Sequence, residues 1–157
     1  MSAPLHSLQS ALEHEVALVQ RFIAILQAEA QALEHPDQAD ALNASTQDKN
    51  DCIDLLTKAG TARENALRAL GFTPDAAGLN QAVETHPALA DLGARLVQLG
   101  QQAVELNASN GAAIDVYLKH TQQALQALQP LVGGAGLYDA SGRPGAVKGQ
   151  RKTITAG

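Results

Sequence analysis

Five histidines and a single cysteine are the first candidates in this sequence for a metal site or a catalytic nucleophile. A dimetal site in a helical bundle requires Glu-x-x-His pairs on facing helices. No such pair exists, because the residues three positions before the histidines are Ala3, Ala11, Ala32, Val83 and Tyr117. The spacing of the histidines and the cysteine matches no zinc motif either. We therefore expect neither a metal site nor another cofactor.

Cys52 and the glycine-rich segment at residues 132–136 are the remaining candidates for catalysis. Cys52 falls on the apolar side of a helical pattern, and no neighbouring residue indicates a lowered thiol pKa. We expect it to be a small buried side chain. The segment VGGAG lacks the Gly-Lys-Ser/Thr ending and the preceding strand of a phosphate loop, which favours a hinge. The sequence therefore predicts a protein that is not an enzyme.

Composition and charge exclude several classes of protein. Aromatic residues make up only 3% of the chain, and its formal net charge is −5. A nucleic-acid-binding protein would need a basic face, so nucleic acid is not an expected partner. The N-terminal residues lack the features of a secretory signal, and no apolar run reaches the roughly 18 residues of a membrane span. A single cysteine suits a reducing compartment, so we expect a cytoplasmic protein.

Apolar residues recur every three or four positions in three long stretches, residues 5–34, 37–70 and 88–129. Such spacing is typical of helices that bury one face. A shorter helix is predicted over residues 75–83. Because the links between the helices are short, neighbouring long helices should run antiparallel. The expected fold class is all-α, an antiparallel bundle of three long helices with a short connector helix and a flexible C-terminal tail.

Two signals define the turn between the second long helix and the connector. Gly71 is predicted to end the helix in a left-handed conformation, with Phe72 packing back on Leu67. Thr73 before Pro74 resembles a helix cap followed by a first turn. The connector should therefore begin directly after a tight turn.

The longest predicted helix is weak at its centre, where Asn107, Asn110 and Gly111 are poor helix formers. The structural interpretation is a mild kink or a close crossing of two helices. The functional interpretation is a place where an incoming helix approaches closely and the amides supply hydrogen bonds. Gly93 and Gly100 would also allow a helix to approach closely. The sequence alone leaves both interpretations open.

The composition changes after Pro130. Residues 131–157 hold seven of the thirteen glycines and four basic residues against one acidic residue. Residues 1–130 hold seven basic and fifteen acidic residues. We therefore predict a helical bundle domain over residues 1–130 and a flexible, basic, glycine-rich tail over residues 131–157. Tyr138 is an aromatic residue in a segment that has no core, which is typical of a docking element.

Four stretches together resemble one protein family. They are LVQRFIAILQAEAQAL in the first helix, ALRALGF at the end of the second, VELNASNGAAIDVYLKHTQQALQAL in the long helix and LYDASGR in the tail. The whole chain is similar to the FlgN family of flagellar type III export chaperones. The pairing of an Asn-x-x-Asn-Gly helix with a downstream Leu-Tyr-Asp-x-x-Gly segment is the more specific part of this resemblance.

The resemblance implies a cytoplasmic chaperone that binds the C-terminal helices of the hook-associated proteins FlgK and FlgL. It also implies docking to the export gate protein FlhA through the tail, at Leu137, Tyr138 and Asp139. The candidate surface for the exported client comprises Asn107, Asn110, Gly111, Ile114, Tyr117, Leu118, Leu125 and Leu128. The alternatives are a helical chaperone for filament or cap proteins and a structural coiled-coil protein that self-associates. A homodimer also remains open.

Overall fold

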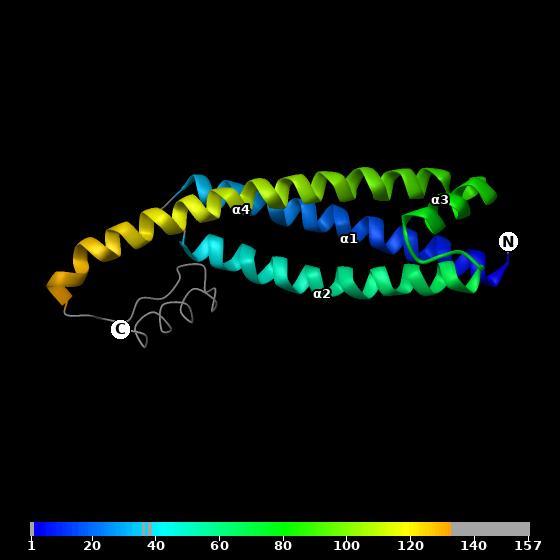
Figure 1. Cartoon of the computed structure of the whole chain (residues 1–157), viewed down its shortest axis with the longest axis horizontal. Helices are drawn as coiled ribbons and strands as arrows, with labels where there is room; N and C mark the ends of the chain where they lie inside the picture. Colours follow the sequence, from blue (N-terminus) through cyan, green and yellow to red (C-terminus); the bar gives the residue numbers. More distant parts are fainter. Residues whose placement is uncertain (1, 36, 38, 133–157) are drawn as a thin grey trace. The chain divides into compact units, whose positions relative to one another are not determined.

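The computed structural model describes residues 2–35, 37 and 39–132 of the chain. These described residues form helices α1 (Ala3–Glu34), α2 (Ala39–Ala69), α3 (Ala76–Thr85), the 3₁₀ helix η1 (Pro87–Leu89) and α4 (Ala90–Val132) (Figure 1). No strand occurs within these ranges, which confirms the predicted all-α class. The three long helices and the short connector helix lie where the apolar spacing predicts them.

Helix α1 begins two residues before the predicted start because Ser2 caps it. The Ser2 hydroxyl oxygen accepts a hydrogen bond from the backbone N–H of Leu5 at 3.3 Å. Pro4 lies in the first turn, where its missing N–H costs no helical hydrogen bond. Within the part of the chain that the structure describes, α1 is the one helix whose length and apolar composition would suffice to cross a membrane. A core helix of a soluble protein meets the same criterion.

Helix α2 ends at Ala69, and the predicted left-handed cap residue, Gly71, has a φ of 85°. The N–H of Gly71 donates to the carbonyl of Arg68 at 2.9 Å, and the N–H of Phe72 donates to the carbonyl of Leu67 at 3.0 Å. These two bonds form a Schellman motif, which satisfies carbonyls that the end of a helix would leave without donors. Phe72 is half-buried against the same core as Leu67. The predicted left-handed cap is thus confirmed.

The cap of α3 is Asp75, so the predicted capping role of Thr73 is wrong. The Asp75 carboxylate accepts from the N–H of Gly78 at 2.9 Å, and the Thr73 hydroxyl donates to the same Asp75 oxygen at 2.6 Å. Both bonds lower the pKa of the Asp75 carboxyl, and the bond from Thr73 contributes most. Thr73 therefore supports the capping residue instead of capping the helix itself. Its carbonyl also approaches Gly78 so closely that no side chain would fit there.

Helix α4 continues without interruption through Asn107, Asn110 and Gly111. The poor helix propensity of these residues is therefore not sufficient to break the helix. At its C-terminal end α4 includes Pro130 and extends to Val132. Leu131 and Val132, predicted to belong to the tail, are thus helical.

The chain divides into two compact units, residues 1–108 and residues 109–157. The boundary falls inside α4, beside the run of poor helix formers at its centre. The predicted domain boundary between residues 130 and 131 is a different division and stays a prediction. In the first unit, side chains from all five elements share one hydrophobic core; they include Leu8, Leu12, Leu26, Cys52, Leu67, Leu79, Leu89, Leu96 and Ala103.

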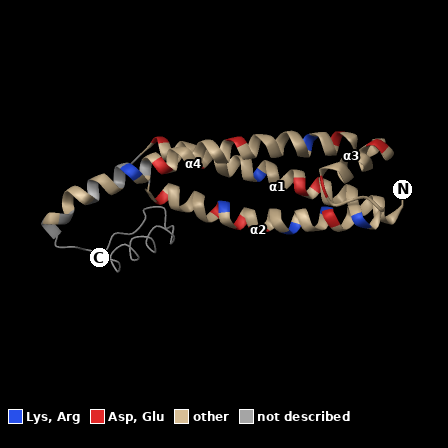
Figure 2. Ribbon diagram, viewed as in Figure 1, with Lys and Arg blue, Asp and Glu red and all other residues tan. Residues whose placement is uncertain are grey.

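Helices α1 and α2 pack side by side and run antiparallel (Figure 1). Both carboxylate oxygens of Glu15 accept hydrogen bonds from Arg63, at 2.7 and 2.8 Å. Further along α1, and nearer the start of α2, Glu29 pairs with Lys49 at 3.4 Å. Both glutamates are buried, whereas most of the other charged residues of these two helices, whose positions along the ribbon Figure 2 marks, are exposed. The two ion pairs therefore lie within the α1–α2 interface.

Candidate functional site

Cys52 has the environment of a structural side chain. It is fully buried, and its thiol donates to the Leu18 carbonyl at 3.7 Å. Burial raises the pKa of the Cys52 thiol, and Arg21 offsets this only in part. A thiol with a raised pKa is a poor nucleophile at neutral pH. The predicted core position of Cys52 is confirmed.

Acidic, histidine and cysteine side chains do not gather into a metal site in the described part of the chain. Among those residues, no group of three or more of these side chains could hold an ion. The described helices therefore offer surfaces for binding another molecule and no candidate metal centre.

The predicted client surface on α4 mixes buried and exposed positions. Asn110 and Ile114 are only 4% and 6% exposed, whereas Asn107 is exposed and Leu128 is 52% exposed. Asn110 also has a polar partner within the structure. Asn110 and Ile114 are therefore buried, and Leu128 is the most exposed apolar residue among the members of the set whose side chains are described.

The other predicted members of this surface are less exposed or not described. Gly111 and Leu118 are half-buried. The side chains of Tyr117 and Leu125 are not among those that the structure describes. The sequence prediction did not include Val116, which is 58% exposed on the same helix. Val116 lies two residues from Ile114 and two from Leu118, so on a helix it points away from both, and this spacing could have indicated its exposure.

The three predicted gate-docking residues, Leu137, Tyr138 and Asp139, lie outside the described residues. Their role stays a prediction.

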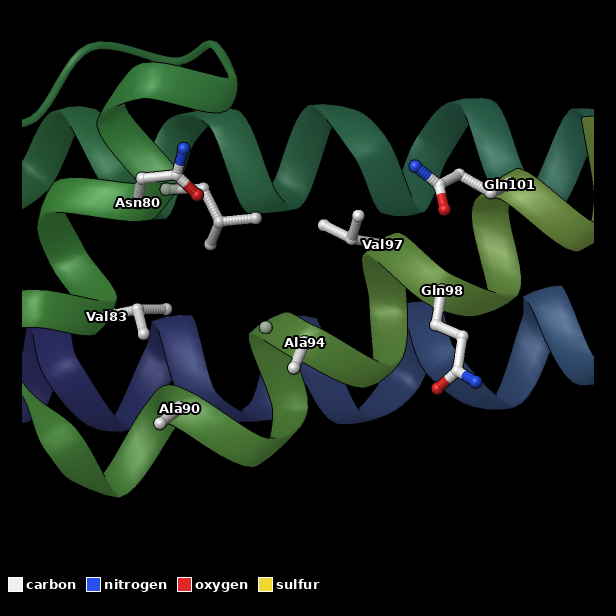
Figure 3. A pocket seen from close by; sticks show the side chains of 9 residues that line it. Asn80, Val83, Ala90, Ala94, Val97, Gln98 and Gln101 are labelled. Atoms are coloured by element: carbon white, nitrogen blue, oxygen red, sulfur yellow. The ribbon is translucent and has the colours of Figure 1, made fainter.

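A hollow of about 410 Å³ lies between α3 and α4 (Figure 3). Val83 on α3 and Val97 on α4 point into it, and its wall is mostly apolar. Gly93 allows α4 to pass close to Val83, since a side chain at this position would collide with that valine. Val97 is half exposed although it faces the hollow. The hollow is therefore open to solvent and lined with carbon.

A second hollow of about 470 Å³ adjoins the first and shares Leu79 and Val97 with it. Gly100 lies in its wall, and a Cβ added there would meet no atom within 4 Å. The two hollows together are called here the α3–α4 groove, which is defined by Leu79, Val83, Gly93, Val97 and Gly100. Its shape and chemistry suit the apolar side of another helix.

Charged residues border the groove where it meets α1 and α2. Glu15, Arg63, Glu64 and Asp75 all line the second hollow. Burial raises the pKa of the Glu15 carboxyl, Arg63 lowers it, and the nearby negative charge of Glu64 raises it again. Arg63 thus neutralises Glu15 by pairing with it, whereas Glu64 and Asp75 give this border of the groove a net negative charge.

The groove was not predicted because Val97 falls outside the main apolar stripe of the long helix. That stripe, which includes Leu92, Leu96 and Leu99, faces the core. A second row along α4 consists, in order, of Gly93, Val97, Gly100 and Val104, and both of its valines are exposed. An apolar and small-residue pattern at i, i+4, i+7 and i+11, offset from the core stripe, was the available signal.

The comparison with protein families gives one match. The model of a family described as FlgN protein matches residues 1–145, which include all the described helices. No curated protein and no solved structure matches the chain. The match covers most of the chain and extends past the three predicted docking residues.

Proposed function

The chain belongs to the FlgN family of flagellar type III export chaperones, and we propose that its clients are the hook–filament junction proteins FlgK and FlgL. Chaperones of this family bind hook-associated proteins and are cytoplasmic in general. In our proposal, this chain covers the C-terminal helices of its clients, prevents their premature assembly and delivers them to the export gate. No cofactor takes part, because binding and release need only noncovalent contacts.

The observation that carries this proposal is the family match over residues 1–145. The described surface supports it physically, because α4 exposes several large apolar side chains, namely Val97, Val104, Val116 and Leu128. Exposed apolar residues at helical spacing are what an amphipathic partner helix would cover. A chaperone also has to release its client, and a dissociation constant near 1 μM corresponds to only about −8 kcal/mol.

The proposal includes an architecture. The three long helices α1, α2 and α4 form one antiparallel bundle over residues 1–130, and residues 131–157 are a separate basic tail. The ion pairs between α1 and α2 and the core shared with the start of α4 support this arrangement. The C-terminal half of α4 contributes the client surface that the sequence predicted, in which Leu128 is 52% exposed. Tyr138, between Leu137 and Asp139, contacts FlhA.

Coexpression with candidate clients tests the function. The full chain should form a one-to-one complex with FlgK or FlgL that persists through size-exclusion chromatography with light scattering. Deletion of the client's C-terminal helix should abolish the complex. A complex formed only with filament or cap proteins would assign a different client class. Oligomers of the chain that form equally well without any client would instead favour a structural coiled coil.

A further inference from the structure

We propose that the α3–α4 groove binds an amphipathic helix of the exported client, with the client's apolar residues over Val97 and Gly100 and a basic side chain beside Glu64. This inference rests on the proposed function, because it assigns a place and a chemical requirement to client binding. It also adds a surface on the first unit to the client-binding residues predicted in the second half of α4.

The shape of the groove accounts for the apolar part of the proposal. Val97 is half exposed, and its side chain points into the groove (Figure 3). Gly100 lies one turn further along α4 and has open space in front of it. A glycine beside an exposed valine lets the backbone of an incoming helix approach closely while the valine packs between its side chains. Covering such a surface removes apolar area from water and favours binding.

The charges around the groove account for the basic side chain. Glu15 and Glu64 both line the groove, but Arg63 directs its hydrogen bonds to the two oxygens of Glu15. Among the described residues, no cation pairs with Glu64, and Asp75 adds a second negative charge to the same border. A lysine or arginine on the client helix would complement this charge. Opposite charges across an interface fix the orientation of the partner and exclude others.

The same charges argue against two other occupants. In a symmetric dimer through this groove, the net negative borders of both copies would lie in one interface, and like charges in an interface are unfavourable. Residues 131–157 of this chain have a suitable positive charge, but seven of them are glycine, which disfavours a helix. An external helix that is apolar on one face and basic at its edge fits both features of the groove.

A charge-exchange experiment tests the contact at Glu64. The probe is a synthetic peptide of the FlgK C-terminal helix, titrated into the full chain in a calorimeter. Glu64→Lys should weaken binding about tenfold, and a peptide with its groove-facing lysine or arginine changed to glutamate should recover most of that loss with the Glu64→Lys chain. Asp54→Lys makes the same charge change on an exposed position of α2 outside the groove and should leave the affinity within about twofold.

A second experiment separates binding from folding. Gly100→Ala should raise the thermal stability of the chain, because alanine favours a helix and the added Cβ meets nothing. The same change should weaken peptide binding several-fold, because the Cβ keeps the client helix away. Val97→Asp should reduce binding at least tenfold, whereas Ile53→Asp, on an exposed position of α2, should not.

The outcomes distinguish this inference from the function on which it rests. If the unmodified chain binds no client helix, both the proposed function and the inference fail. If the unmodified chain binds the peptide but Glu64→Lys, Gly100→Ala and Val97→Asp leave the affinity unchanged, the client lies elsewhere and only the inference fails. If these variants alter the sedimentation of the chain alone and not its affinity for the peptide, the occupant is a second copy, which also overturns the inference.

Discussion

Gly93 on α4 lies so close to Val83 on α3 that a Cβ at Gly93 would come within 2.7 Å of the Val83 Cγ2 atom. This approach brings the connector helix against the long helix and sets the width of the hollow between them. The absence of a side chain at Gly93 is therefore a requirement of the packing. Gly100, one heptad further along the same helix, has no such constraint.

These two glycines should respond oppositely to the same substitution. Both would gain about 1 kcal/mol of helix propensity on change to alanine. At Gly93, the collision with Val83 should cost about 1–3 kcal/mol, because a packed side chain must move. Urea unfolding of the two variants measures the difference, with Gly100→Ala as the more stable protein. Equal stabilities would mean that α3 can move away from α4 without cost.

Substitutions at Gly71 should measure the cost of a left-handed backbone conformation without a steric contribution from neighbouring side chains. Its φ of 85° is unfavourable for residues with a side chain, yet no atom lies within 4 Å of an added Cβ. Gly71→Ala should therefore destabilise the chain by about 1–2 kcal/mol through the left-handed conformation only. Gly71→Asn should cost less, since asparagine tolerates this region better. Thermal unfolding of both variants checks the order, and an alanine variant as stable as the parent would contradict it.

The Glu15–Arg63 pair should make stability depend on pH in a defined direction. Burial raises the pKa of Glu15 in the folded chain, so the folded state holds this proton more tightly than the unfolded state does. Its contribution is fully present below the ordinary glutamate pKa and is lost as the pH rises through the raised value. Glu15→Gln should remove this loss and give a flatter stability profile across that interval. Unfolding free energies measured from acidic to neutral pH provide the test.

Removing Arg63 supplies the matching control for this pair. Arg63→Met leaves the Glu15 carboxylate buried without its cation, which should cost about 3 kcal/mol at neutral pH and less in acid. Combining Arg63→Met with Glu15→Gln should recover most of that loss. A double variant as unstable as Arg63→Met alone would show that the arginine acts through packing and not through charge.

Leu128 is the position of choice for testing the second half of α4. The side chain is 52% exposed, so Leu128→Asp should weaken client binding about tenfold while leaving helicity intact. Ile114→Asp is a poorer test, because Ile114 is buried and its loss would also disturb packing. Circular dichroism and peptide titration on the same sample separate the two effects. Unchanged affinity in Leu128→Asp would exclude this end of the helix from the client surface.

Substitution of Tyr138 should weaken binding to the export gate protein and leave binding to the client unchanged. If the tail contacts the export gate, Tyr138→Ala should weaken binding to the cytoplasmic part of FlhA by about tenfold or more, as loss of an aromatic anchor commonly does. Binding of the FlgK helix should stay within about twofold of the unmodified chain. Pull-down and titration against each partner separately provide the measurement. A parallel loss of client binding would contradict a two-site arrangement.

The helices could be predicted because their apolar periodicity is strong and their ends carry local signals. Gly71 is the clearest case, since one glycine after a leucine-rich stretch indicates both the cap and the packing of Phe72. The cap of α3 was assigned wrongly because Thr73 and Asp75 are both good capping residues. Only the three-dimensional path of the turn decides that the Asp75 carboxylate reaches Gly78.

The binding surfaces were less predictable, because helical spacing does not say which of two apolar faces meets the core. Ile114 and Val97 illustrate this, since Ile114 is a candidate member of the client surface and is buried, whereas Val97 is not in that set and is half exposed. Which face is buried depends on the neighbouring helices, whose positions arise from contacts distant in sequence. The apolar spacing therefore predicts where the helices lie in the sequence, but not which of their apolar faces is buried.

The two buried ion pairs also solve a problem of alignment that repeated leucines create. A sequence with apolar residues every heptad can slide by one heptad and still match apolar with apolar. In α2 and the residue that follows it, the positions at heptad intervals are Leu42, Lys49, Leu56, Arg63 and Leu70. If α1 slid by one heptad in either direction, Glu15 and Glu29 would each face a leucine in place of a cation. The slipped hairpins would thus bury two uncompensated carboxylates, which leaves one register for α1 and α2.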